Sequence, residues 1–229
     1  MSAAAATDLL THRTRPAPAA PQGALVLLHG RGTDERDLLP LADALDPERR
    51  LVALTPRAPL TLPGQPGAHW YVVRRVGFPD PDTFAATYAR LSAWLDALPE
   101  ALGVPWERTV LGGFSQGAAM SFALGLGPRR PAPAGILALS GFVPSVPGFE
   151  PVLDGREGFP VALGPRRRRP GHPGHLRARR ARAAADRRRR RALPRDARTG
   201  PRDRPGVRAG AARLARRAHA GALIRRRGR

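Results

Sequence analysis

The segment Thr109–Gly117, TVLGGFSQG, holds the residues that decide the fold of this 229-residue chain. Its first residues are apolar, which favours a short buried strand, and the glycines after them favour a tight turn. From Gln116, QGAAMSFALGLG continues as a run of small and apolar residues suited to a helix. The last five residues of the segment, GFSQG, fit the pattern G-x-S-x-G, in which a sharp strand-to-helix turn exposes a strained serine above a sheet. Ser115 is therefore the candidate nucleophile.

A second glycine-rich strand end lies upstream, where ALVLL from Ala24 runs into HGRG. A continuous apolar run of this kind is typical of a strand buried on both faces of a parallel sheet. Acyl transfer places negative charge on a carbonyl oxygen, and two fixed backbone N–H groups stabilise that charge. We expect the N–H groups of Arg31 and Gln116 to form this oxyanion hole. His29 has two interpretations, a residue that shapes the turn or the catalytic base, and the first is favoured.

Predicted strands and helices alternate along the first two thirds of the chain. Further strands are predicted to begin at Leu51, Gly135 and Pro160, and helices at Asp34 and Thr83. The first helix contains Pro40, which limits or kinks it, and the second is stopped by Gly103. Such an alternation predicts an α/β fold with a mostly parallel sheet covered on both faces.

The segments LLHGRG, GGFSQGAAMS and LALSGFVP, in this order and at these distances, resemble those of the phospholipase/carboxylesterase branch of the α/β-hydrolases, which includes acyl-protein thioesterases. The resemblance covers about residues 23–163 and implies a three-layer α/β-hydrolase sandwich. It implies Ser115 as nucleophile, with Arg31 and Gln116 donating the oxyanion hole. It also implies that Trp70 and Tyr71 border the acyl pocket, although paired aromatic residues also serve for packing.

The implied reaction is hydrolysis of a small carboxylic ester or thioester, and it requires no metal and no organic cofactor. Ser140, in SGF at a predicted strand end, is expected to be structural. The chain has no Cys, which excludes a disulfide framework and a cysteine nucleophile. It also has no apolar run long enough to span a bilayer.

Three segments are predicted from composition. Residues 1–22 are expected to be a disordered leader of a cytoplasmic protein, because the alanine run is too short for a secretory signal and is followed by Asp8. Residues 23–163 form the predicted hydrolase core. Residues 164–229 form a predicted disordered tail, in which 25 Arg face 3 Asp, whereas residues 1–163 carry 14 Arg and 15 acidic residues. The whole excess behind the net charge of +21 therefore lies in the tail.

The tail lacks the two residues that the resemblance requires after the serine. In this family an Asp follows the next strand in a segment HGxxDPxxP, and a His follows some thirty residues later in a GH pair. Read one base later, the codons from Gly164 permit A-H-G-x-x-D-P-V-I-P, with Asp where Arg169 is printed. The codons of Gly200 and Pro201 permit Gly-His. We therefore hypothesise that the tail is an out-of-frame reading that begins between Phe159 and Pro165, which would leave the printed chain impaired.

Two alternatives take the tail as printed. In the first, it is an Arg-rich arm that binds nucleic acid or another polyanion on an inactive core, without sequence specificity and with strong salt dependence. The tail has no aromatic residue for base stacking, which disfavours an evolved nucleic-acid arm, although nonspecific polyanion binding is expected in either case. In the second, the catalytic base and its partner come from the printed tail. The candidate residues are His172, His175 and His219 with Asp186, Asp196 and Asp203.

Overall fold

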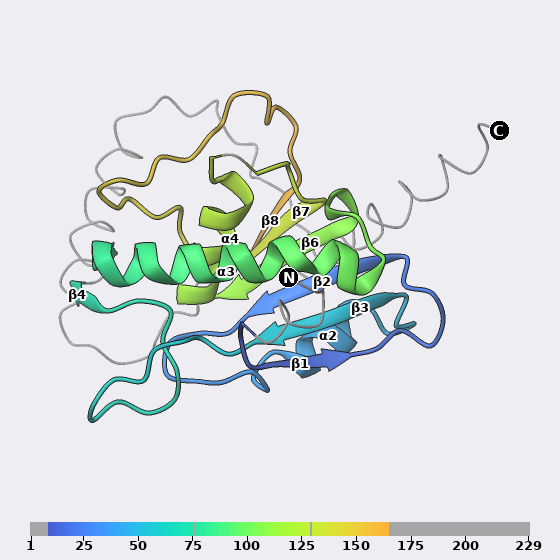
Figure 1. Ribbon diagram of the computed structural model, residues 1–229, viewed down its shortest axis with the longest axis horizontal. Helices are drawn as coiled ribbons and strands as arrows, with labels where there is room; N and C mark the ends of the chain where they lie inside the picture. Colours follow the sequence, from blue (N-terminus) through green and yellow to red (C-terminus); the bar gives the residue numbers. More distant parts are fainter. Residues whose placement is uncertain (1–8, 76, 129, 165–229) are drawn as a thin grey trace, which may run out of the picture. The chain divides into compact units, whose positions relative to one another are not determined.

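A mostly parallel sheet organises the part of the chain that the computed structural model describes, which is residues 9–75, 77–128 and 130–164 (Figure 1). Within those residues the sheet has six strands in the order β1-β3-β2-β6-β7-β8. The strands are β1 (His12–Arg15), β2 (Gly23–Leu28), β3 (Leu51–Pro56), β6 (Thr109–Phe114), β7 (Gly135–Leu139) and β8 (Val161–Gly164). Only β1 runs antiparallel to its neighbour, so the predicted α/β class with a mostly parallel sheet is confirmed.

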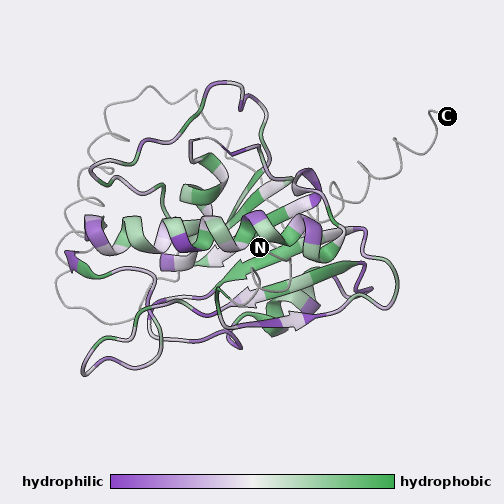
Figure 2. Ribbon diagram, viewed as in Figure 1, coloured by the Kyte–Doolittle hydropathy of each residue, from purple (hydrophilic) through white to green (hydrophobic). Residues whose placement is uncertain are grey.

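Helices cover both faces of this sheet, which makes the three layers that the resemblance implies. The helices α3 (Pro81–Leu102) and α4 (Gln116–Leu126) share one apolar cluster with alternate residues of β2, such as Val26. The short helix α2 (Leu39–Leu45) shares a second cluster with the intervening residue Leu27. In Figure 2 the central strands are mostly apolar, whereas α3 carries both polar and apolar residues. Every residue of β2 and β3 is buried, as expected of central parallel strands.

The long helix α3 has a cap at each end. Asp80 precedes it and accepts a hydrogen bond from the Thr83 N–H at 3.1 Å, and Gly103 ends it in the left-handed conformation, with φ 63°. The predicted start of the first helix at Asp34 is wrong, because α2 begins at Leu39; Pro40 lies in its first turn and limits the helix instead of kinking it. None of the helices in the described ranges is long and apolar enough to cross a membrane.

A hairpin that the sequence did not predict precedes α3. Its strands, β4 (Val73–Arg75) and β5 (Phe78–Pro79), pair antiparallel in a separate two-stranded sheet. An ion pair of 3.0 Å joins Arg74 to the helix cap Asp80, so the hairpin is fixed to the start of α3.

The prediction of a disordered leader through residue 22 is wrong for the segment that forms β1. This strand pairs along its whole length with β3, and Leu10, just before it, is 3% exposed. Its sequence, HRTR, has no apolar side chain, and only Arg15 is buried. The interactions that hold β1 come from residues far away in the chain, which is why local sequence gave no sign of it. The predicted tail from Gly164 lies outside the described residues, apart from Gly164 itself.

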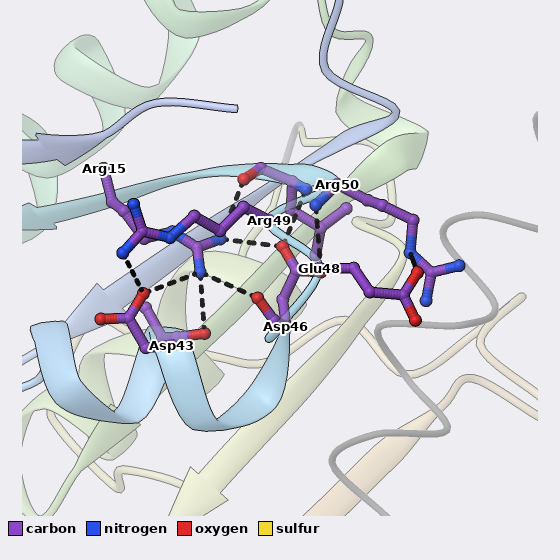
Figure 3. Close-up of polar contacts among 8 residues, drawn as sticks. Arg15, Asp43, Asp46, Glu48, Arg49 and Arg50 are labelled. Atoms are coloured by element: carbon purple, nitrogen blue, oxygen red, sulfur yellow. Dashed lines mark hydrogen bonds and ion pairs between the residues drawn. The ribbon is translucent and has the colours of Figure 1, made fainter. Parts of the chain in front are cut away.

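The buried guanidinium of Arg15 joins β1 to the end of α2 and the start of β3 (Figure 3). Its Nη1 donates to the carbonyl oxygens of Ala42 and Asp46, both at 3.1 Å, and adds a second donor to the backbone N–H that each of them already accepts. Its Nη2 donates to Asp46 Oδ2 at 2.8 Å and to the Leu51 carbonyl oxygen at 2.9 Å. The Asp46 carboxylate also accepts the N–H groups of Arg50 and Leu51. Arg15 and Asp46 are 6% and 4% exposed, so this is a buried, charge-assisted network.

Replacing Arg15 should therefore destabilise the fold strongly. We expect Arg15→Met to lower the free energy of unfolding by about 3–5 kcal/mol, because it leaves the buried Asp46 carboxylate without its cation and removes one donor from each of the carbonyls. The matched control is Arg13→Met on the same strand, where Arg13 is 49% exposed and lies 3.9 Å from Glu35. That variant should cost only about 0–1 kcal/mol. Urea denaturation measures both, and equal losses would contradict the role assigned to Arg15.

Candidate active site

Ser115 occupies a strained turn between β6 and α4. Its φ of 54° and ψ of −110° lie in a region that residues other than glycine rarely adopt, at a cost of about 1–3 kcal/mol. The Ser115 N–H donates to the carbonyl oxygen of Leu139 at 2.9 Å, so the neighbouring strand β7 holds the turn. The Ser115 carbonyl accepts the N–H of Ala119 at 3.1 Å and begins the helix. The serine is partly exposed, as the G-x-S-x-G pattern predicts.

The two glycines of the pattern are required by close backbone approaches. A Cβ atom at Gly117 would overlap the carbonyl oxygen of Leu28, at the end of β2. A Cβ atom at Gly113 would lie 2.7 Å from the same oxygen and 2.5 Å from the Gly117 carbonyl carbon. The start of α4 therefore crosses the end of β2 so closely that a side chain at either glycine would overlap the backbone. Ser115 is held between these two contacts.

The HGRG turn lies at the same edge of the sheet as Ser115. Strands β2 and β6 are parallel neighbours, and Leu28 is in register with Gly113, so the residues that follow each strand emerge side by side. A Cβ atom at Gly30 would lie 2.8 Å from the ring of Phe114, which confirms that the two turns touch. Gly32 has φ 79°, and its N–H donates to the Ala68 carbonyl at 3.0 Å. Arg31 lies between these two glycines and is exposed.

His29 shapes the turn, because both of its ring nitrogens serve the local backbone. The N–H of Ala58 donates to His29 Nε2 at 3.0 Å, so Nε2 carries a lone pair. The proton therefore lies on Nδ1, which donates to the Gly30 carbonyl at 2.7 Å. His29 is 1% exposed, and burial lowers its pKa below the ordinary value of 6.5. A buried neutral imidazole whose lone pair is already used is not placed to take a proton from Ser115.

The loop that carries Trp70 and Tyr71 is tied to both turns by hydrogen bonds that the sequence did not reveal. The indole N–H of Trp70 donates to the His29 carbonyl at 2.8 Å. The side chain of Gln116 accepts the Trp70 backbone N–H at 3.1 Å and donates to the Tyr71 carbonyl at 2.8 Å. Gln116 was predicted only as a backbone donor, yet its buried amide also fixes this loop.

Both aromatic side chains of this loop lie in the core. Trp70 is 0% exposed and Tyr71 is 2% exposed, and both belong to the main apolar cluster. Burial raises the pKa of Tyr71 well above its ordinary value of 10, so the phenol stays neutral. Both residues therefore serve for packing, which is one of the two roles that the sequence allowed. That they also border an acyl pocket stays a prediction.

Ser140 is a second strained residue beside the elbow. Its φ is 55°, and it directly follows Leu139, whose carbonyl holds the Ser115 N–H. The next residue, Gly141, packs so closely against Ala118 of α4 that a Cβ atom would overlap it. The SGF segment therefore helps to fix the serine turn, in keeping with the structural role expected for Ser140.

A family model described as Phospholipase/Carboxylesterase matches residues 13–155, which is more than half of the chain. The chain belongs to the phospholipase/carboxylesterase family. The match begins within β1, so this strand is part of the family fold and not of a leader.

Individual proteins resemble the chain in sequence or in fold. Acyl-protein thioesterase 1 of Yarrowia lipolytica (strain CLIB 122 / E 150) is 31% identical over 140 residues, which cover 56% of this chain and 61% of that protein. The crystal structure of esterase PE8 superposes with a TM-score of 0.56 at 30% identity and covers 67% of this chain and 73% of its own. A Bacillus cereus carboxylesterase superposes with a TM-score of 0.55 at 24% identity and covers 66% and 69% of the two chains. The chain thus spans about 61% of the length of its thioesterase relative.

Within residues 9–75, 77–128 and 130–164, no histidine or carboxylate side chain forms a hydrogen bond with the Ser115 side chain, so the His and Asp that the resemblance implies are not found there. Three histidines lie in these residues, and His29 and His69 are each 1% exposed. The ring of His12 contacts the Leu10 carbonyl oxygen at 2.9 Å and packs against Trp94. The described part also holds no cluster of three side chains suited to a metal ion. The candidates from the printed tail lie outside the described residues: His172, His175, His219, Asp186, Asp196 and Asp203.

The buried state of His29 predicts how stability depends on pH. Because burial lowers its pKa in the folded chain, the unfolded chain binds more protons below pH 6.5, and stability is lost as the pH falls through this window. His69 has a pKa lowered chiefly by burial as well and adds to the loss. Each histidine contributes a slope of up to about 1.4 kcal/mol per pH unit.

Replacing the ring of His29 with a side chain that cannot titrate should reduce this slope. We expect the unfolding free energy of His29→Gln, whose amide oxygen can accept the Ala58 N–H, to depend less steeply on pH between 7 and 5. The difference in slope should correspond to up to one proton fewer taken up on unfolding. Urea denaturation at several pH values measures it. The same variant at pH 8 is the control for losses that do not depend on pH. Parallel profiles for the variant and the natural chain would show that His29 is not held neutral.

Proposed function

We propose that the chain hydrolyses carboxylic esters or thioesters through an acyl-enzyme on Ser115. The observation that carries the proposal is the geometry of Ser115, with φ 54°, at a turn that glycines allow to pack against the end of β2. Backbone strain of this kind costs stability, and strained residues cluster at functional sites. The family match and the thioesterase relative support the substrate class.

The reaction would proceed in two steps. The Ser115 Oγ attacks the substrate carbonyl and loses its proton to a base, and the leaving alcohol or thiol takes up a proton as the bond breaks. Water then attacks the acyl-serine ester and releases the acid. In both steps the carbonyl oxygen becomes negative, and the N–H groups of Arg31 and Gln116 would donate to it. Gln116 is the first residue of α4, so its N–H has no acceptor within the helix, and the helix dipole favours negative charge there.

We propose that a shift of reading frame explains why the base and its Asp partner are missing from the printed sequence. The proton would pass to a His encoded where Pro201 is printed, oriented by an Asp encoded where Arg169 is printed. The family match ends at residue 155, before the charge changes at Gly164, which supports a shift in this interval. As printed, the chain would be impaired, and the nonspecific binding of its Arg-rich segment to polyanions remains a second proposal.

Turnover tests the proposal directly. One base is removed between the codons of Phe159 and Pro165, and the restored and printed chains are compared on p-nitrophenyl butyrate and on a short acyl thioester. The restored chain should exceed the printed chain by about 10⁴-fold or more in kcat/KM, since loss of triad members removes most of the rate. Equal activity of the two chains would contradict the reading-frame explanation.

Two serine variants of the restored chain separate the nucleophile from general effects. Ser115→Ala should reduce hydrolysis to the level of the printed chain or below. Ser92→Ala is the matched control, because Ser92 lies on α3 with a buried hydroxyl that has no hydrogen-bond partner in the described residues. It should leave kcat/KM unchanged. Full activity of Ser115→Ala would refute the proposed nucleophile.

A further inference from the structure

A cavity of about 190 Å³ lies between the residues just before β1, the segment after β3 and helix α3. It is open to solvent on one side. A volume of this size can hold a small solute. The lining residues are Leu10, Thr11, Arg57, Ala58, Pro59, Leu60, Thr61, Ala68 and Arg90.

Among the described residues, the cavity is lined by two arginines and by no carboxylate. Arg57 directly follows β3 and Arg90 lies in the middle of α3, so the two arginines come from different parts of the fold. Thr11 and Thr61 are the other lining residues with polar side chains in the described part of the chain. Each guanidinium offers five N–H donors and no acceptor, and each hydroxyl offers one donor. The two arginines therefore favour a ligand that accepts hydrogen bonds, and the hydroxyls can donate to it as well.

Within the described residues, Arg57 is only partly neutralised and Arg90 forms no ion pair. Arg57 Nη1 pairs with Glu35 at 3.0 Å, but the same carboxylate also faces Arg13 at 3.9 Å, so two cations share one charge. Arg90 forms no ion pair in the described part of the chain, and its one hydrogen bond there runs from Nε to the Leu9 carbonyl at 2.9 Å. That contact leaves the two Nη groups of Arg90 as donors. A net positive charge beside a concave site attracts anions.

We propose that this cavity binds a phosphate group, either as free phosphate or on a small organic molecule. Two guanidinium groups and two hydroxyls supply more donors than the two oxygens of a carboxylate can use, whereas the oxygens of a phosphate match them. The site does not depend on the hydrolase chemistry of Ser115, since none of its lining residues takes part in that chemistry.

The walls of the cavity also touch the support of the HGRG turn. The N–H of Ala58 donates to His29, and Ala68 exchanges backbone hydrogen bonds with Gly32 and Thr33. Ala58 and Ala68 are 4% and 1% exposed, so the backbone on this side of the cavity is buried and held by hydrogen bonds. A bound phosphate would therefore rest on backbone that is already fixed, and the two arginine side chains would supply the adjustable contacts.

Chemical modification of individual arginines can locate such a ligand in the full chain. Phenylglyoxal modifies accessible guanidinium groups, and peptide mass spectrometry reports the rate at each one, so binding of phosphate to Arg-rich segments elsewhere does not interfere. Inorganic phosphate at about twice its dissociation constant should slow modification of Arg57 and Arg90 about threefold relative to sodium chloride of equal ionic strength. Arg75, exposed and also without an ion pair in the described residues, should not be protected beyond the chloride control.

Two variants make this test specific. Arg90→Gln should abolish the protection of Arg57 by phosphate, because binding requires both arginines. Arg75→Gln, the matched control, should leave that protection intact. Equal protection of Arg75 and Arg90, or protection of Arg57 that persists in Arg90→Gln, would overturn the proposal. Glycerol phosphate in place of phosphate distinguishes the sources: protection at lower concentration supports an organic phosphate ligand, and protection at higher concentration supports free phosphate.

Discussion

The close approach between Gly117 and the carbonyl oxygen of Leu28 is the constraint on which the rest of the site depends. It lets helix α4 begin directly above the end of β2 and places Ser115 at the point where strand β6 must turn. The same crossing brings the HGRG turn against Phe114. A single methyl group at Gly117 would separate these elements, and the serine and the proposed oxyanion donors would no longer share one edge of the sheet.

Hydrogen bonds around this crossing offset the strain that it creates. The two residues with positive φ near the elbow, Ser115 and Ser140, each cost about 1–3 kcal/mol. Against this stand the Ser115 N–H bond to Leu139, the amide contacts of Gln116 to the Trp70 loop, and the ring contacts of His29. Each buried hydrogen bond contributes about 0.5–1.5 kcal/mol. The turn is thus held from three directions before any substrate binds.

The sequence predicted the features that depend on local patterns. The central strands appear as continuous apolar runs, and α3 as a helically spaced apolar face that ends at Gly103. The turn of Ser115 follows from glycine spacing. Features that depend on distant partners were missed or wrong. Strand β1 is held by Arg15, whose partners lie 27–36 residues away, and its own four residues are polar. The tautomer of His29 depends on the Ala58 N–H, and the second role of Gln116 depends on a loop more than 40 residues away.

The central claim is that Ser115 is a nucleophile on a preformed elbow, and covalent labelling tests it most directly. The frame-restored and printed chains are each treated with a fluorophosphonate, which reacts with activated serines, and the adduct is mapped by peptide mass spectrometry. The predicted result is a single adduct on the peptide that contains Ser115, formed rapidly in the restored chain and far more slowly in the printed chain. An adduct on another serine, or none on Ser115 in the restored chain, would contradict the claim.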